Sequence, residues 1–250
     1  MLNNFLKDPL ANSLAVVVLV ALVSAWVASL GIILKDSPVG AAKSWHNRLL
    51  PFFALLGFPA ALDLLQTRGL TLAFAALVTL VLTMSFIIPI LRLKQASSHP
   101  LVTDWNRWAV PFLALAGVAV AGYLAFVETA NASPLCGPVG DCGAVQNSKY
   151  ATLFGVLPIG VLGLLGYAAI LVAWLALQFG PENLKKWAAL ALWGCGVFGV
   201  LFSAYLTFLE PFVIGATCMW CITSAVLMIL LLWVATPAAQ QALTIPEEDE

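Results

Sequence analysis

Four of the five cysteines fall into two close pairs, and such pairs can exchange disulfides, bind zinc or cross-link loops. Cys136 and Cys142 are six residues apart, and Cys218 and Cys221 form a C-x-x-C motif. We expect this motif at the start of a helix, where unpaired backbone N–H groups and the helix dipole favour the reactive thiolate. Four cysteines allow three pairings. The local pairing is the one that lets a thiolate released from one disulfide attack the other.

The composition indicates where these cysteines work. Of the 250 residues, 62% are hydrophobic and 9% are charged, with a net charge of −1. A soluble domain carries about 25% charged residues, so a soluble protein is excluded. No cluster of Lys and Arg is present, which argues against a nucleic-acid-binding surface, and the apolar excess argues against disorder. The chain is therefore expected to be a polytopic membrane protein that contacts lipid.

Seven segments are long and apolar enough to cross a bilayer as helices, which takes about 20 residues each. They predict an all-α integral membrane protein, because a barrel would need alternating polar and apolar residues. The expected spans are Leu14–Leu34, Leu49–Gln66, Leu70–Leu91, Trp108–Val127, Leu153–Leu177, Trp187–Leu209 and Ile214–Val234.

The basic residues of the short loops predict the orientation of these spans. Eight of the 11 Lys and Arg residues fall on one side of the membrane, which is then cytoplasmic. The N-terminus is predicted to lie outside and the acidic C-terminal tail inside. The inner set is Lys35, Lys43, Arg48, Arg92, Lys94, Arg107, Lys185 and Lys186; the outer set is Lys7, Arg68 and Lys149.

An internal repeat with a period of 82 residues places the two cysteine pairs on the same side. The pattern Tyr-Leu-x-Phe-x-Glu at residues 123–128 recurs at 205–210, and Cys136 and Cys218 each follow the glutamate by eight residues. Parallel repeats of this kind bring both cysteine pairs to one membrane surface. Glu128 and Glu210 are interpreted as charges at interfacial helix ends, with proton handling as the alternative.

Two other interpretations of the cysteines remain open at this point. Both pairs could be static disulfides in outer loops, or the four thiolates could bind zinc. Zinc is disfavoured because the six-residue separation of the first pair is loose and both histidines, His46 and His99, are placed on the cytoplasmic side. No metal is therefore expected. Cys195, in the middle of a span, is interpreted as a packing residue.

A redox relay would need an electron acceptor. The chain contains no segment typical of nucleotide binding, haem ligation or an iron–sulfur cluster. A quinone dissolved in the membrane is then the acceptor that remains. It takes up two electrons and two protons, which matches the oxidation of one dithiol to one disulfide.

The order and spacing of these residues resemble the vitamin K epoxide reductase family. The resemblance covers roughly residues 107–234 and rests on two cysteine pairs, a serine, a Leu-Phe-Gly segment and two helix residues. These are Cys136-x5-Cys142, Ser148, Leu153-Phe154-Gly155, Gly163, Tyr167 and Cys218-x-x-Cys221.

The resemblance implies a four-helix bundle around a quinone and a role for each cysteine. Cys136 would exchange with a thioredoxin-like partner, Cys142 would react with Cys218, and Cys221 would face the quinone. Ser148 matches the loop serine of the family, which helps to order the loop and the site.

Four further residues are candidate quinone contacts: Ala151, Phe154, Trp220 and Ala225. Vertebrate members have an asparagine where this chain has Ala151 and a tyrosine where it has Ala225. We therefore expect the ordinary quinone-linked reaction rather than epoxide reduction.

The domain organisation expected from these observations has four parts. Residues 1–93 form three helices without an assigned role, 94–106 a cytoplasmic linker, 107–236 the redox domain, and 237–250 the acidic cytoplasmic tail. The chain ends soon after its last span, so the thioredoxin-like partner is expected to be a separate protein.

The function expected is that of a membrane thiol–disulfide oxidoreductase in a bacterial inner membrane. It would take electrons from a periplasmic, DsbA-like protein and pass them to a quinone of the ubiquinone or menaquinone type, which supports disulfide formation. The alternative is a non-enzymatic membrane protein of transport or assembly with two structural disulfides.

Overall fold

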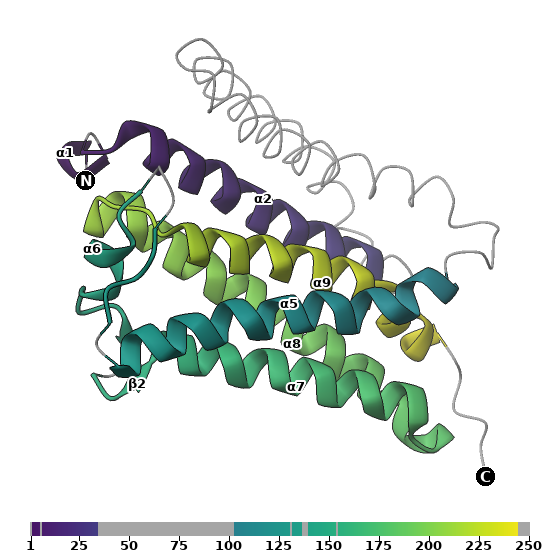
Figure 1. The fold of residues 1–250 in the computed structure, drawn as a ribbon. Coiled ribbons are helices and arrows are strands. Elements are labelled where there is room, and N and C mark those ends of the chain that lie inside the picture. The colour runs from purple at the N-terminus through teal and green to yellow at the C-terminus, as the bar shows by residue number, and fades with distance from the viewer. Residues whose placement is uncertain are drawn as a thin grey trace.

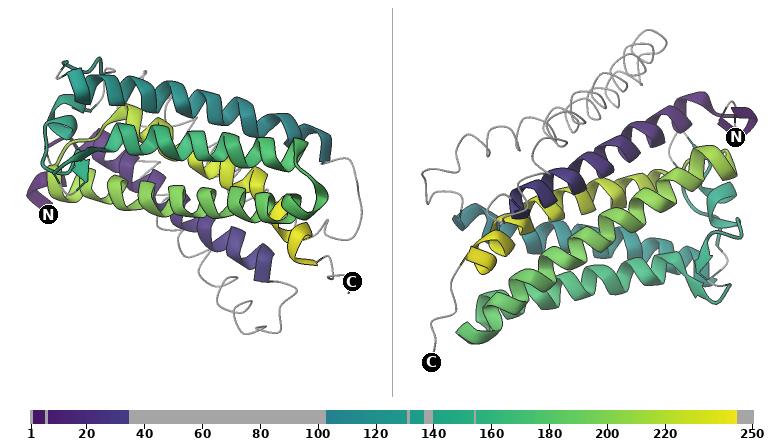
Figure 2. Two further views of the ribbon diagram at one scale, coloured as in Figure 1. Left: turned by 90° about the horizontal axis from the view of Figure 1, so that it is seen from below. Right: turned by 180° about the vertical axis from the view of Figure 1, so that it is seen from behind.

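The computed structural model describes residues 2–5, 7–34, 103–130, 132–136, 140–153 and 155–244. Five long helices run side by side in this part of the chain (Figures 1 and 2), and each has the length and apolar character to cross a membrane. This agrees with the prediction of an all-α membrane protein. The five are α2 (Pro9–Ile33), α5 (Thr103–Ala130), α7 (Ile159–Phe179), α8 (Glu182–Leu209) and α9 (Met219–Thr244).

Two of the seven expected spans, Leu49–Gln66 and Leu70–Leu91, lie outside the described residues. Most of the expected linker, 94–106, lies outside them as well. Its last four residues belong to the first turn of helix α5, which begins at Thr103.

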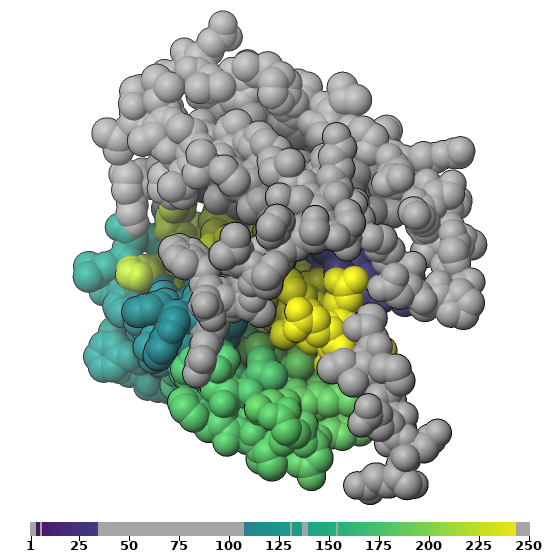
Figure 3. Space-filling view, turned by 90° about the vertical axis from the view of Figure 1, so that its right-hand side faces the viewer, coloured from purple at the N-terminus to yellow at the C-terminus, as the bar shows by residue number. Residues whose placement is uncertain are grey.

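The short elements gather at one end of the bundle, on the left in Figure 1. Strands β1 and β2 form an antiparallel pair in which Thr152 lies opposite Pro158 and Leu153 opposite Leu157. The opposite end, seen in Figure 3, presents α7 and α8 in green beside the end of α9 in yellow. The short elements are α1 (Leu2–Phe5), α6 (Cys142–Gln146), β1 (Thr152–Leu153), β2 (Leu157–Pro158) and η3 (Glu210–Ile214).

Helix α2 is an integral part of the bundle. It starts at Asp8, whose side chain accepts the Ala11 N–H at 3.1 Å, and Pro9 occupies the first helical position, both common features of helix starts. Its buried face is rich in alanine, which lets helices approach closely in a membrane. This face packs against α8 and α9. The buried alanines include Ala11, Ala15, Ala21, Ala25 and Ala28.

A polar chain of hydrogen bonds fixes α2 to both of these helices towards its C-terminal end. Trp193 Nε1 of α8 donates to Ser29 Oγ at 2.8 Å, and Ser29 Oγ lies 2.9 Å from Thr236 Oγ1 of α9. Thr236 in turn donates to the Leu232 carbonyl at 2.6 Å. The first helix therefore shares its core with the predicted redox domain.

Several expected span boundaries differ from the structure, and in two cases another element occupies the expected helix start. Helix α7 begins at Ile159 rather than Leu153, because residues 152–158 form the strand pair and Pro158 precedes the first turn. Helix α9 begins at Met219 rather than Ile214. The π-helical turn η3 extends α8 through Pro211, and Gly215 ends this turn by donating its N–H to the Glu210 carbonyl at 2.7 Å.

The last helix extends into the segment expected to be the C-terminal tail, residues 237–250. Helix α9 continues through Pro237 to Thr244, so residues 237–244 are helical rather than part of a tail that follows the last span. The segment after the proline reads Ala-Ala-Gln-Gln-Ala-Leu-Thr. Most of these residues are good helix formers, which explains why the helix continues.

We expect Ser29→Ala to destabilise the protein by about 1 kcal/mol, because it removes the acceptor of a tryptophan N–H inside the membrane region. The free energy of unfolding, measured by denaturant titration in detergent micelles, checks this. Ser13→Ala, at the other end of the same helix, is the matched control. An equal effect of the two substitutions would contradict the role of the hydrogen-bond chain.

Candidate active site

The first cysteine pair is a disulfide, Cys136–Cys142, with the two Cα atoms 5.7 Å apart. This is the local pairing that the spacing favours. Cys142 is the first residue of α6, and Asp141 caps that helix by accepting the Ala144 N–H at 2.9 Å. Cys142 is completely buried, whereas Cys136 is exposed. Only one sulfur of this pair therefore faces the surroundings of the protein.

The second cysteine pair lies at the start of helix α9, as the C-x-x-C motif predicts. Cys218 directly precedes the helix and is completely buried, and its sulfur accepts the Cys221 N–H at 3.5 Å. Hydrogen bonds lower the pKa of the Cys218 thiol, first of all the bond from the Cys221 thiol, with smaller contributions from backbone N–H groups and Gln146. The reactive thiolate of Cys218 is therefore favoured at this helix start.

A backbone hydrogen bond joins the two cysteine segments. Asp141 donates its N–H to the Thr217 carbonyl at 3.1 Å, so the residues that precede Cys142 and Cys218 are in direct contact. Gly140 makes this approach possible. Its φ is +88°, and a Cβ atom at this position would collide with the Thr217 oxygen.

The buried sulfurs of the two pairs belong to one hydrophobic cluster. Cys142 and Cys218 pack together with Val145 and Ala216, and Cys221 borders the same cluster. The prediction that both pairs meet at one end of the bundle is therefore confirmed.

Helix α2 contributes to the site through Asn12, which sequence analysis did not single out. Asn12 is completely buried, and its Oδ1 accepts the Thr217 hydroxyl at 3.0 Å. Its Nδ2 donates to the Phe5 carbonyl at 3.0 Å. In the same region Asn4 donates to the Val213 carbonyl at 2.9 Å. No clear signal in the sequence indicated this role, because Asn12 lies just before the first expected span.

Glu210 lies inside the site, so its interpretation as an interfacial end charge is wrong. The side chain is 2% exposed, and its Oε2 accepts the Cys218 N–H at 3.2 Å. The carboxyl also interacts electrostatically with the Cys221 thiol. The π-helical turn η3 explains this position, because it carries the helix past Leu209 towards the start of α9.

Glu128, the repeat counterpart, is half-buried and bonded to the protein. Its Oε2 accepts the Gly160 N–H in the first turn of α7 at 2.7 Å. It thus satisfies one of the free N–H groups at that helix start. A charge that merely extends into the interface would have no such partner.

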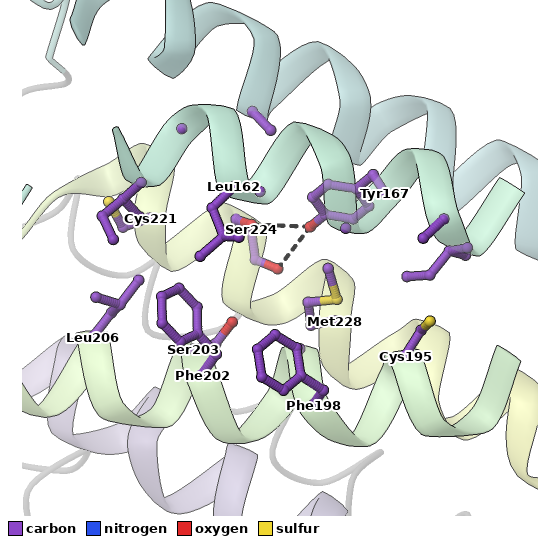
Figure 4. Close-up of a pocket in the computed structure, with 18 of the residues that line it drawn as sticks. Leu162, Tyr167, Cys195, Phe198, Phe202, Ser203, Leu206, Cys221, Ser224 and Met228 are labelled. Atoms are coloured by element: carbon purple, nitrogen blue, oxygen red, sulfur yellow. Dashed lines mark hydrogen bonds between the residues drawn. The ribbon is translucent and has the colours of Figure 1, made fainter. Parts of the chain in front are cut away.

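A large apolar cavity of about 470 Å³ begins at Cys221 and extends between α7, α8 and α9 (Figure 4). Cys195 lies towards its other end. The polar groups that line the cavity include Ser203 and a pair formed by Tyr167 and Ser224, whose hydroxyls lie 2.9 Å apart. Sequence analysis named Tyr167 only as part of the family resemblance and assigned no role to either hydroxyl.

A second cavity, of about 40 Å³, also borders Cys221. It is lined by both glutamates of the repeat and by residues of the cysteine loop. Ser148, whose hydroxyl accepts the Tyr150 N–H at 3.3 Å, is among them, and so is Ala151.

The remaining predicted contacts are not brought together at the large cavity. Trp220 instead donates its Nε1–H to the Leu135 carbonyl at 2.8 Å and packs on Tyr123, so it braces the residue before Cys136. Ala225 is buried in the core, and Phe154 lies outside the described residues. Within the described ranges, no three Cys, His, Asp or Glu side chains gather as a metal site.

Comparisons with known proteins agree with this geometry. Residues 108–236 match the model of the vitamin K epoxide reductase family. A curated relative, the thiol-disulfide oxidoreductase LTO1 of Arabidopsis thaliana, is 33% identical over 113 residues. The match covers 42% of this chain and 29% of the relative, so the chain spans less than a third of that protein's length. No solved structure matches the chain.

The contact between the cysteine segments can be tested by cross-linking. In a variant with Cys136→Ala and Cys221→Ala, we expect mild oxidation to join Cys142 to Cys218, as detected by mass spectrometry of peptides. Adding Gly140→Ala is expected to slow the formation of the cross-link about tenfold or more. The alanine backbone would be strained by about 1–2 kcal/mol in the left-handed conformation, and its Cβ atom would also collide with the Thr217 carbonyl oxygen.

Gly155→Ala is the matched control for that experiment. Gly155 has a similar φ of +73°, but a Cβ atom there meets no atom within 4 Å. It therefore imposes the strain without the collision, and the cross-link should form at nearly the parent rate. Equal rates in the Gly140 and Gly155 variants would show that the two segments are not held as described.

Proposed function

The chain belongs to the vitamin K epoxide reductase family, and on this premise we propose that it is a membrane thiol–disulfide oxidoreductase that passes electrons from an external dithiol to a quinone. The observation that carries the proposal is the graded accessibility of the four sulfurs. Cys136 is exposed, Cys142 and Cys218 share a buried cluster, and Cys221 lines the large cavity.

The order of exchange follows from this arrangement. A thiolate of the partner attacks the exposed sulfur of Cys136, breaks the Cys136–Cys142 bond and releases Cys142 as a thiolate. Cys142 then attacks Cys218 of the oxidised second pair, and Cys221 leaves as a thiolate. The partner's second thiol resolves the mixed disulfide at Cys136, and the Cys136 thiolate then attacks Cys142, which re-forms the Cys136–Cys142 bond and releases Cys218 as a thiolate. One dithiol outside the protein is thereby oxidised, and its two electrons reach the Cys218–Cys221 pair.

The large cavity suits a quinone as the acceptor of these electrons. Its volume of about 470 Å³ lies within the range of about 300–1,000 Å³ for small-molecule sites, and its walls are mostly apolar. The hydroxyls of Tyr167 and Ser224 offer polar contacts next to Cys221 (Figure 4). A bound quinone supplies a two-electron acceptor there, and a ubiquinone- or menaquinone-like molecule would meet the need.

The partner and the location follow the same reasoning. The exposed Cys136 suits exchange with a separate thioredoxin-like protein of the DsbA type on the outer side of a bacterial inner membrane. The start of α2 and the end of α5 lie at the cysteine end of the bundle, which agrees with an outward N-terminus. The eight-to-three distribution of basic residues supports the same orientation.

Single cysteine substitutions test the relay. We expect Cys221→Ala to abolish reduction of a soluble quinone by a reduced thioredoxin-like protein, because the last sulfur before the cavity is lost. Cys195→Ala, which removes a thiol towards the end of the cavity away from Cys221, is the matched control and should retain quinone reduction. Cys142→Ala should accumulate a partner-linked disulfide at Cys136. A disulfide between the partner and Cys221 would contradict the proposed order of the relay. If the cysteine pairs are static disulfides, no disulfide with the partner should form at all.

Filling the large cavity tests the position of the quinone. Gly166 lines the cavity, and Gly166→Leu is expected to raise the KM for quinone about tenfold, since one obstructing methylene group costs about 1–3 kcal/mol. Gly122→Leu, on α5 and in open space outside the cavity lining, should leave the KM unchanged. Equal KM values for the two variants would place the quinone elsewhere.

A further inference from the structure

Two glutamates from equivalent positions of the repeat converge on Cys221. We propose that Glu210 exchanges a proton with the Cys221 thiol and that Glu128 connects Glu210 to the outer side through the small cavity between them. This inference rests on the proposed function, because it assigns the proton movements that accompany electron transfer through the second cysteine pair.

The contacts of Glu210 place it at the reacting atoms. Its carboxyl accepts the backbone N–H of Cys218 at 3.2 Å, interacts electrostatically with the Cys221 thiol and lines the same small cavity as Cys221. The group is therefore bonded to one residue of the redox pair and shares a cavity with the other. Within the described part of the chain, no Lys or Arg forms an ion pair with it. A buried carboxyl without a cation is costly inside a membrane protein, and such groups typically serve function.

The small cavity connects the two glutamates. Glu128, Glu210 and Cys221 all line its volume of about 40 Å³. A water molecule needs about 10–15 Å³ of such space and two to four polar partners, so the cavity has room for one.

The side chain of Gln146 gives independent evidence for a water in this cavity. It lines the same space, and its Oε1 atom is buried without a hydrogen-bond partner. Buried acceptors are normally satisfied, by protein or by ordered water. A water here would donate to Gln146 and bridge the two carboxyl groups. Because Glu128 is only half-buried, the path continues to the outer surface.

The chemistry balances with one proton for each oxidation of the pair. With Cys218 as the thiolate, oxidation breaks the S–H bond of Cys221, forms one S–S bond and releases one proton and two electrons. The quinone accepts the two electrons and, with two protons from bulk water, becomes the quinol. The Glu210 carboxylate takes the thiol proton as a new O–H bond and passes it through the water and Glu128 to the outer side. When Cys142 later attacks Cys218, the S–S bond breaks, and the departing Cys221 thiolate takes up a proton from Glu210 that returns from the outer side through Glu128.

Glu210→Gln in the full-length protein tests the inference, because glutamine can still accept the Cys218 N–H but cannot carry the proton. We expect the kcat for quinone reduction to fall about 100-fold, the typical contribution of a positioned acid or base, while the KM for quinone stays the same. Glu182→Gln is the matched control, since Glu182 lies at the opposite end of the same helix in an exposed pair with Lys185. Glu128→Gln should also lower kcat, because it interrupts the same path.

A second readout uses no quinone. In a Cys136→Ala, Cys142→Ala background, reduction of the Cys218–Cys221 disulfide by a soluble phosphine should change the infrared band of a carboxyl group. The change should vanish with Glu210→Gln and persist with Glu182→Gln. A band change that survives Glu210→Gln, or a kcat within about twofold of the parent, would overturn the inference. If the parent shows the band change but reduces no quinone, the proposed function fails and the proton exchange stands.

Discussion

The hydrogen bond from the Asp141 N–H to the Thr217 carbonyl holds the two halves of the site together. Each partner directly precedes a cysteine at a helix start, so one backbone contact sets the positions of Cys142 and Cys218. Gly140 permits the approach, and Asn12 fixes the Thr217 side chain from the first helix. Residues far apart in the chain, and one outside the region that matches the family, therefore converge on a single contact.

The same end of the bundle separates three environments around the sulfurs. Cys136 faces water, the buried cluster around Cys142 and Cys218 excludes it, and Cys221 borders both the small cavity with the two glutamates and the large apolar cavity. Disulfide exchange needs a thiolate and direct contact, whereas a quinone needs an apolar site and a supply of protons. Because Cys221 borders both cavities, both requirements are met at one sulfur.

Much of this architecture could be predicted from the sequence, because membrane helices and redox motifs have strong local signals. Apolar length predicted the five described spans, and the equal Glu-to-Cys spacing placed Cys136 and Cys218 at one end. The burial of Glu210 could not be predicted, because hydropathy locates a helix end without revealing that a π-helical turn continues it through Pro211. The roles of Trp220 and Asn12 depend on contacts with distant segments, to which residue type and local spacing give no access.

The order in which the cysteines lose electrons tests the central claim most directly. Fully reduced protein in lipid vesicles would be mixed with a soluble quinone, quenched with acid after increasing times, and its disulfides identified by mass spectrometry. The account predicts that Cys218–Cys221 forms first and that Cys136–Cys142 follows. Formation of the Cys136–Cys142 disulfide before the other pair would contradict it.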